Sequence, residues 1–246
     1  FESVSFGYDG RRPVLHGIDL ELEPGKTVAL IGHTGSGKTT VASLVPRFYD
    51  VTAGGITIDG LDVRAAKLTS LRRAIGIVAQ DPFLFSATVR ENISFGRPDA
   101  TDEQVQEAAR LAQAAEFIDN LPDGYDTVIG ERGITLSGGQ RQRIAIARAL
   151  ILDPRILILD DATASVDATT EARIRLGLRA AMRGRTTIII AHRLSTLALA
   201  DELVVLDRGR VAARGTHDDL LERSSVYREI YDHGLLESEF AARVEG

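Results

Sequence analysis

Residues 32–39 read GHTGSGKT and bring together three glycines, a lysine and two threonines. The apolar run 28–31 before them predicts a buried parallel strand, and residues 40–48 after them are compatible with a helix. A glycine-rich turn between a strand and a helix is the context of a phosphate-binding P-loop, because its N–H groups can converge on phosphate oxygens at the positive end of the helix. The stretch therefore predicts a phosphate site.

The side chains of this loop predict a nucleotide and a magnesium ion as its ligands. Lys38 would lie against the β- and γ-phosphates, where two unit charges about 4 Å apart interact by roughly 4 kcal/mol at an effective dielectric near 20. Thr39 offers its hydroxyl to Mg²⁺. The residues expected to hold the nucleotide are Gly32, Thr34, Gly35, Ser36, Gly37, Lys38, Thr39 and Thr40. A surface turn that matches by chance is the alternative, which the flanking strand and helix disfavour.

Tyr8 lies in an expected hairpin just upstream of the loop. Its ring could stack on a nucleobase, a contact worth about 1–3 kcal/mol. An ordinary surface tyrosine in a turn is the alternative, and proximity to the phosphate loop favours stacking.

Three polar side chains follow apolar runs that predict buried strands, and open α/β sheets bind ligands at the carboxyl ends of such strands. Gln80 could coordinate Mg²⁺ or accept a hydrogen bond from metal-bound water, and Asp160 could hold Mg²⁺ through its water shell. His192 is placed to contact the γ-phosphate. Solvated strand-end side chains are the alternative at each position.

A second anion site is predicted at residues 136–140, LSGGQ, which lead into a helical segment. Ser137, Gly138 and Gly139 would mark the helix N-terminus, where exposed N–H groups attract negative charge. One nucleotide does not need two such cradles far apart in the chain. The pair therefore indicates dimerisation.

The chain as a whole predicts an α/β fold. Its 246 residues suffice for one domain or a core with an inserted lobe. We expect a P-loop NTPase (RecA-like) core with an antiparallel β subdomain, residues 1–85 and 153–246, and an inserted α-helical lobe, residues 86–152. Within these parts, 56–58 is expected to form a short strand between turns, and 101–104 is a capping box.

Composition narrows the class of protein. A net charge of −6 argues against a nucleic-acid binder, and the absence of cysteine fits a reducing compartment. The sequence shows no signal peptide and no apolar run near 18 residues. Because it begins at Phe1, we interpret it as a soluble piece of a longer protein.

These motifs, in this order, resemble the nucleotide-binding domain of ABC transporters of the exporter type, over essentially all of the chain. The matching positions are Tyr8 at the A-loop, residues 32–39 at Walker A, Gln80 at the Q-loop, 130–133 at the X-loop, 136–140 at the signature sequence, 156–160 at Walker B, 165–167 at the D-loop and His192 at the H-switch.

The resemblance implies an ATPase that uses ATP and Mg²⁺ and powers export at the cytoplasmic face of the cell membrane. Similar domains pair head to tail, so Ser137, Gly138, Gly139 and Gln140 would act on the ATP of a second nucleotide-binding domain. Transmembrane domains would be the other partner, reached through Gln80 and residues 130–133. No nucleic acid is expected.

One position departs from the family pattern, because Asp161 stands where glutamate usually follows the Walker B aspartate. The carboxylate is pulled back by about 1 Å, and a misplacement of that order can cost about 100-fold in rate. The expected catalytic residues are Lys38, Gln80, Asp161 and His192, with slow hydrolysis at this P-loop. The chain then resembles the degenerate-site half of a heterodimeric exporter, with a non-identical partner.

Three alternative hypotheses about the function remain. A homodimer could use Asp161 through a bridging water, and a non-transport ABC ATPase would work on DNA or ribosomes. A small-molecule P-loop kinase would leave the signature helix without a role.

Overall fold

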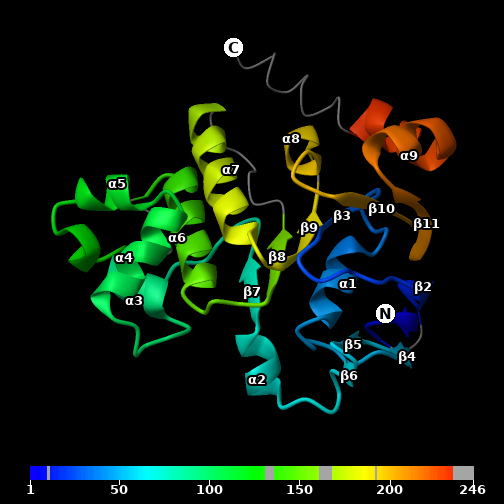
Figure 1. Ribbon diagram of the computed structural model, residues 1–246, viewed down its shortest axis with the longest axis horizontal. Helices are drawn as coiled ribbons and strands as arrows, with labels where there is room; N and C mark the ends of the chain where they lie inside the picture. Colours follow the sequence, from blue (N-terminus) through cyan, green and yellow to red (C-terminus); the bar gives the residue numbers. More distant parts are fainter. Residues whose placement is uncertain (10–11, 131–135, 161–167, 192, 235–246) are drawn as a thin grey trace. The chain divides into compact units, whose positions relative to one another are not determined.

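The computed structural model describes residues 1–9, 12–130, 136–160, 168–191 and 193–234. The chain divides into two compact units, Phe1–Arg72 with Thr187–Gly246, and Arg73–Thr186. Both units contain strands and helices, as the expected α/β class requires (Figure 1). The boundaries of the expected helical lobe, 86–152, stay a prediction.

The first unit begins with an antiparallel sheet in the order β2-β1-β4. Strand β1 (Glu2–Phe6) pairs with β2 (Leu15–Ile18) on one side and with β4 (Ala53–Gly55) on the other. The turn expected at 53–55 is therefore wrong, because these residues pair with β1, whereas the strand expected at 56–58 is confirmed at Thr57–Ile58. Gly54 permits this close approach, because a Cβ there would lie 2.4 Å from the carbonyl oxygen of Glu2.

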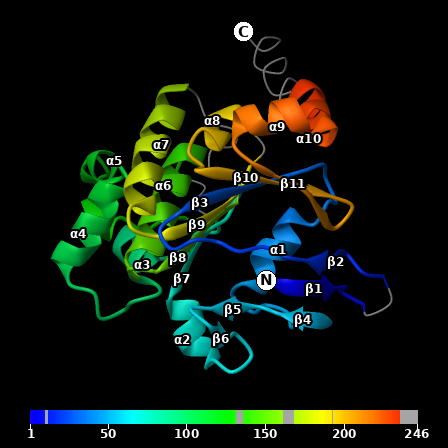
Figure 2. The same ribbon diagram turned by 45° about the vertical axis from the view of Figure 1, so that its right-hand side comes forward.

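A second group of strands in this unit surrounds β3 (Thr27–Ile31) (Figure 2). Strands β10 (Glu202–Asp207) and β9 (Thr186–Ile190) flank it in parallel, and β11 (Arg210–Gly215) forms an antiparallel hairpin with β10. All five residues of β3 are buried, as is usual for a parallel strand covered on both faces. The phosphate loop thus leaves the centre of this group.

Helix α1 (Lys38–Leu44) follows the phosphate loop. It begins two residues before the expected helical segment 40–48 and ends four residues before the expected end. Val45, which precedes Pro46, still has helical dihedrals, and the helical conformation stops at Arg47, whose φ is 53°. The other elements of this unit are β5 (Thr57–Ile58), β6 (Leu61–Asp62), α2 (Leu68–Arg73), which ends at the boundary, α8 (Leu194–Leu197), α9 (His217–Arg223), α10 (Ser225–Glu229) and the π-helical turn η3 (Ile230–Gly234).

The second unit pairs β7 (Ile75–Val78) in parallel with β8 (Ile156–Asp160), with Val78 opposite Leu159. Its central helix is α6 (Gly138–Leu150), against which the other long helices pack. The remaining helices are α3 (Val89–Ser94), α4 (Asp102–Leu111), α5 (Ala115–Asp119), the 3₁₀ turn η1 (Gly124–Asp126) and α7 (Ala168–Met182). The expected capping box is confirmed at Thr101 and Gln104.

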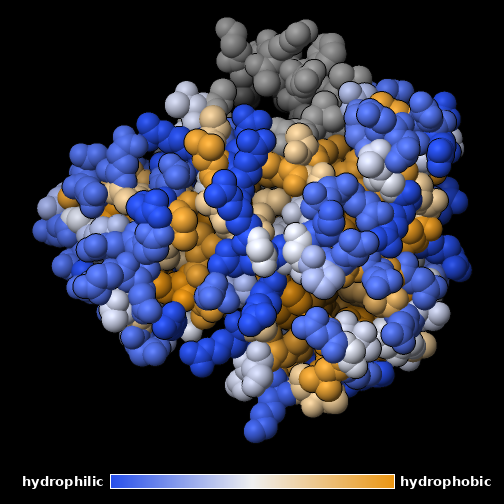
Figure 3. Space-filling model, in the orientation of Figure 1, coloured by the Kyte–Doolittle hydropathy of each residue, from blue (hydrophilic) through white to orange (hydrophobic). Residues whose placement is uncertain are grey.

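The surface is mostly polar, with apolar patches between the polar side chains on the face seen in Figure 3. Among the described residues, no helix combines the length and apolar character needed to cross a bilayer.

Candidate functional site

The loop between β3 and α1 is built on glycines that other residues would not fit. A Cβ on Gly32 would lie 2.3 Å from the Leu206 carbonyl oxygen and 2.4 Å from the Ser36 Oγ. Gly37 has a φ of 105°, and a Cβ there would lie 2.5 Å from a methyl group of Leu15. Backbone conformation and crowding together therefore require glycine at both ends of the loop.

Lys38 folds back over this loop. Its Nζ donates to the carbonyl oxygens of Gly32 at 2.7 Å and His33 at 3.1 Å, and the residue is only 5% exposed. The ammonium is thus held inside the turn that would surround a phosphate. This position supports the predicted role of Lys38 as the charge that meets the ligand.

Two polar features of the loop fit a ligand that offers acceptor oxygens. The N-cap residue of α1 is Gly37, which has no side chain to bond the first-turn N–H groups. The Oγ of Ser36 is buried and has no hydrogen-bond partner among the described residues. Buried hydroxyls are normally bonded, so the loop fits a ligand that offers acceptor oxygens, as a phosphate does.

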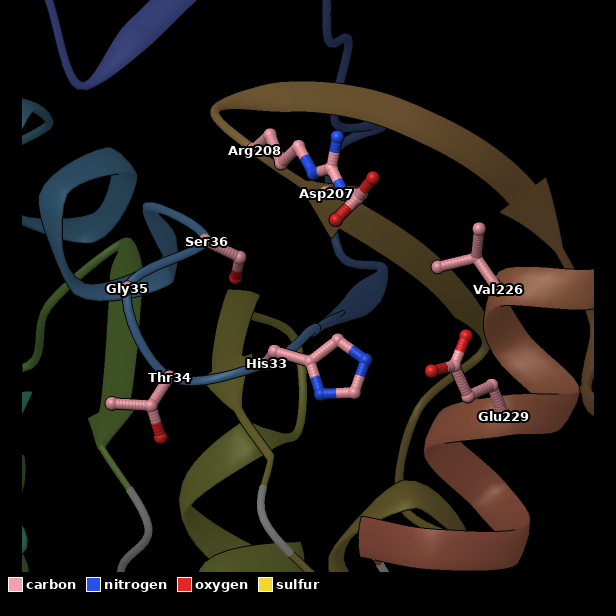
Figure 4. A pocket seen from close by; sticks show the side chains of 8 residues that line it. All are labelled: His33, Thr34, Gly35, Ser36, Asp207, Arg208, Val226 and Glu229. Atoms are coloured by element: carbon pink, nitrogen blue, oxygen red, sulfur yellow. The ribbon is translucent and has the colours of Figure 1, made fainter.

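A cavity of about 440 Å³ adjoins one side of the loop. His33, Thr34, Gly35 and Ser36 line it together with Asp207, Arg208, Val226 and Glu229. Figure 4 shows the His33 ring and the Glu229 carboxylate turned toward the same space, from the loop and from α10. The exposed part of the loop is therefore surrounded mainly by polar groups.

Tyr8 contacts a threonine through its hydroxyl and two other aromatic rings through its own ring. Its hydroxyl lies 3.0 Å from the Oγ1 of Thr40, and the rings of Phe6 and Tyr49 meet it at 82° and 89°. Tyr8 remains 56% exposed. The nucleobase contact stays a prediction, and the hydrogen bond to Thr40 is a tie to the P-loop helix that the sequence did not indicate.

Replacing Tyr8 with phenylalanine is expected to weaken nucleotide binding about threefold, because the stacking ring is kept and one hydrogen bond of about 0.5–1.5 kcal/mol is lost. Tyr8→Ala, which also removes the stack, should weaken it by tenfold or more, given about 1–3 kcal/mol for base–aromatic stacking. Calorimetric titration with ATP measures both, and Tyr49→Phe is the matched control. Equal affinity in Tyr8→Ala and the unmodified chain would contradict the stacking role.

In the second unit, Gln80 and Asp160 lie at the same edge of the β7–β8 pair. The pairing of Val78 with Leu159 places both residues just beyond the last paired positions. An amide and a carboxylate oxygen suit the oxygen preference of Mg²⁺. Within the described part of the chain no cluster of three or more histidine, aspartate or glutamate side chains could hold a metal ion.

The signature segment begins α6 with a capping box. The Oγ of Ser137 accepts from the Gln140 N–H at 3.2 Å, and the Gln140 Oε1 accepts from the Ser137 N–H at 2.9 Å. Ser137 and Gly138 are exposed, whereas Gly139 is buried. This box was not among the sequence-based predictions, although a serine followed three residues later by a glutamine is its usual signal. The exposed N-terminus supports the predicted anion site.

Several predicted residues lie outside the described part of the chain. They are Asp161, His192, the D-loop 165–167 and, in the X-loop, residues 131–133. Their roles stay predictions.

Comparison with known proteins identifies the family. Residues 15–164 match the ABC transporter family, and this span includes the P-loop, the signature segment and the end of β8. The chain belongs to the ABC transporter family. It has the fold of an exporter nucleotide-binding domain, since a bacterial Atm1-family ABC exporter with ATP bound matches 94% of it with a TM-score of 0.89 and 50% identity.

Relatives of known name support the exporter type of this ABC ATPase domain. An uncharacterised ABC transporter ATP-binding protein of Bacillus subtilis, YknV, is 49% identical over 100% of the chain and 40% of its own length. An ATP-dependent lipid A-core flippase of Nitrosococcus oceani is 53% identical over 94% of the chain and 39% of its own length. The Atm1-family exporter is covered over 41% of its chain. The chain thus spans about two fifths of the length of these relatives.

Proposed function

We propose that this ABC domain binds ATP with Mg²⁺ and hydrolyses it to power export by a membrane transporter. It would work at the cytoplasmic face, paired head to tail with a second, non-identical nucleotide-binding domain. The observation that supports this proposal is the coexistence in one chain of two features suited to anions, the P-loop with Lys38 folded over it and the exposed N-terminus of α6. One domain would supply half of each of two composite sites.

The chemistry would be transfer of the γ-phosphoryl group to water, which breaks the bond between the γ-phosphorus and its bridging oxygen and releases ADP and phosphate. Such catalysis is largely positioning and charge stabilisation. Lys38 and the loop N–H groups would hold the β- and γ-phosphates, and Asp161 would orient the water. His192 would steady the γ-phosphate. Thr39, Gln80 and Asp160 would hold Mg²⁺, which neutralises phosphate charge when bound.

An aromatic surface offers a contact site for the rest of the transporter. It consists of Phe83, Phe85 and Phe95, whose rings contact one another at centroid distances of 5.2 and 4.3 Å. Phe83 and Phe95 are 57% and 58% exposed. Clustered exposed aromatics indicate an interaction site, and these follow closely on Gln80. We infer that the cytoplasmic ends of the transmembrane helices dock there.

The pairing predicts a concentration-dependent activity. The purified chain should turn over ATP negligibly at high dilution, because each P-loop then lacks the signature segment of a partner. Activity should rise with concentration or with addition of the partner domain, as a coupled phosphate assay at fixed total ATP can measure. Brisk turnover by a strict monomer, verified by light scattering at the same dilution, would refute the composite site.

A further inference from the structure

The signature helix α6 is hydrogen-bonded to the chain on both sides of Gln80. From α6, Gln142 Nε2 donates to the Ala79 carbonyl oxygen at 3.2 Å, one residue before Gln80. Arg148 Nη1 donates to the Phe83 carbonyl oxygen at 2.7 Å, three residues after it. Gln142 is only 5% exposed, so its bond is shielded from competing water.

Arg148 also holds the segment that carries the aromatic surface. Its Nε donates to the Asn92 carbonyl oxygen at 2.8 Å and its Nη2 to the Asn92 Oδ1 at 2.7 Å, while its guanidinium carbon lies 5.4 Å from the centroid of the Phe85 ring. Asn92 is fully buried and exchanges hydrogen bonds with the backbone of Phe85, accepting at 2.9 Å and donating at 3.0 Å. Arg148 and Asn92 therefore fasten residues 83–92 to α6.

Desolvating the Arg148 guanidinium costs free energy, which a side chain with a packing role alone would not require. Burial lowers the pKa of Arg148 to about 10, and within the described residues no carboxylate pairs with it. Replacing a buried charge with an apolar side chain of similar size is often neutral or stabilising. The planar fork of arginine, however, bonds several fixed oxygens at once, which lysine and leucine cannot do.

We propose that Gln142 and Arg148 are positioning residues that make α6, Gln80 and the aromatic surface move as one body. This inference rests on the proposed function, in which Gln80 serves the chain's own ATP and the start of α6 serves the partner's. A displacement of Phe83 or Phe95 would then be passed to the signature segment, because Gln142 and Arg148 bond the chain on both sides of Gln80 to α6. Energetic coupling of this kind travels through packed and hydrogen-bonded groups.

The chain offers a matched control on the same helix. Arg143 is also buried, donates to the carbonyl oxygens of Gly139 and Gln113 at 3.2 and 2.7 Å, and lies 4.6 Å from the centroid of the Phe117 ring. Its bond to Gln113 leads to the chain just beyond the end of α4, whereas the bonds of Arg148 lead to Phe83 and Asn92. Arg143→Lys therefore removes the same chemistry in a different place.

The test compares Arg148→Lys with Arg143→Lys in the complete transporter. Arg148→Lys should reduce the stimulation of ATP turnover by transported substrate about tenfold while ATP affinity is unchanged. Hydrogen exchange at the Phe85 amide should accelerate in Arg148→Lys alone. Arg143→Lys should keep both the stimulation and the slow exchange. Equal loss of stimulation in the two variants, or full stimulation in a folded Arg148→Lys protein, would overturn the inference.

A second variant tests the same inference if Arg148→Lys does not fold. Gln142→Met keeps the size of the side chain and removes the donor to Ala79, and stimulation should again fall while ATP affinity holds. Retention of full stimulation would count against the coupling. If the unmodified protein does not hydrolyse ATP, the proposed function fails, and the exchange difference between the arginine variants still decides whether Arg148 holds this segment.

Discussion

Replacing Lys38 with alanine is expected to weaken ATP binding by about 100-fold or more. A charge pair at an effective dielectric near 20 is worth roughly 4 kcal/mol at about 4 Å, and each 1.4 kcal/mol is a factor of about ten in affinity. The buried position of the ammonium inside the loop limits screening by water. Calorimetric titration of the purified chain with ATP and Mg²⁺ measures the loss.

Lys26→Ala is the matched control, because Lys26 is an exposed lysine just before β3, the strand that leads into the loop. It should leave the affinity unchanged. Thermal unfolding of Lys38→Ala shows whether the loop carbonyls of Gly32 and His33 tolerate the loss of their donor. Tight ATP binding by a folded Lys38→Ala chain would contradict the P-loop assignment.

Replacing Asp161 with glutamate is expected to raise the single-turnover rate at this P-loop about 100-fold. The longer side chain would return the carboxylate by about 1 Å to the distance that the family usually provides, and a misplacement of that order can cost about 100-fold. Quenched-flow measurement with ATP bound at this site, and the partner's own site inactivated, isolates the step.

Two further variants distinguish the effect of the position of the carboxylate from the effect of its charge. Asp161→Asn keeps the length and removes the charge, so a further drop in rate would show that Asp161 already acts through a bridging water. Asp160→Glu lengthens the neighbouring carboxylate and should slow the reaction, since Asp160 is proposed to hold Mg²⁺. An unchanged rate in Asp161→Glu would contradict the slow-site hypothesis.

The strand and the turn that form the P-loop could be predicted from the sequence, because the apolar pattern and the placement of glycines there agree with the tertiary structure. A fully apolar run became the buried strand β3, and the glycines fell where crowding by Leu206 and Leu15 requires them. Element ends were less predictable. The helix after the loop was extended across Pro46, and Ala53–Gly55 was treated as a turn because its pairing partner, β1, lies far away in the sequence.

The tertiary roles of polar side chains were the least predictable part. Nothing in the spacing of Arg148 relates it to Phe83 or Asn92, which are 65 and 56 residues away. The bond between Tyr8 and Thr40 likewise joins residues 32 apart. Such contacts depend on how whole elements pack, whereas the capping box at Ser137 is local and could have been recognised.

The bonds from the Lys38 ammonium to Gly32 and His33 join the helical end of the P-loop to its strand end. The spacing of the N–H groups along the loop is therefore set partly by a cross-link within the chain itself, so a substitution of the lysine should alter the shape of the loop as well as its charge.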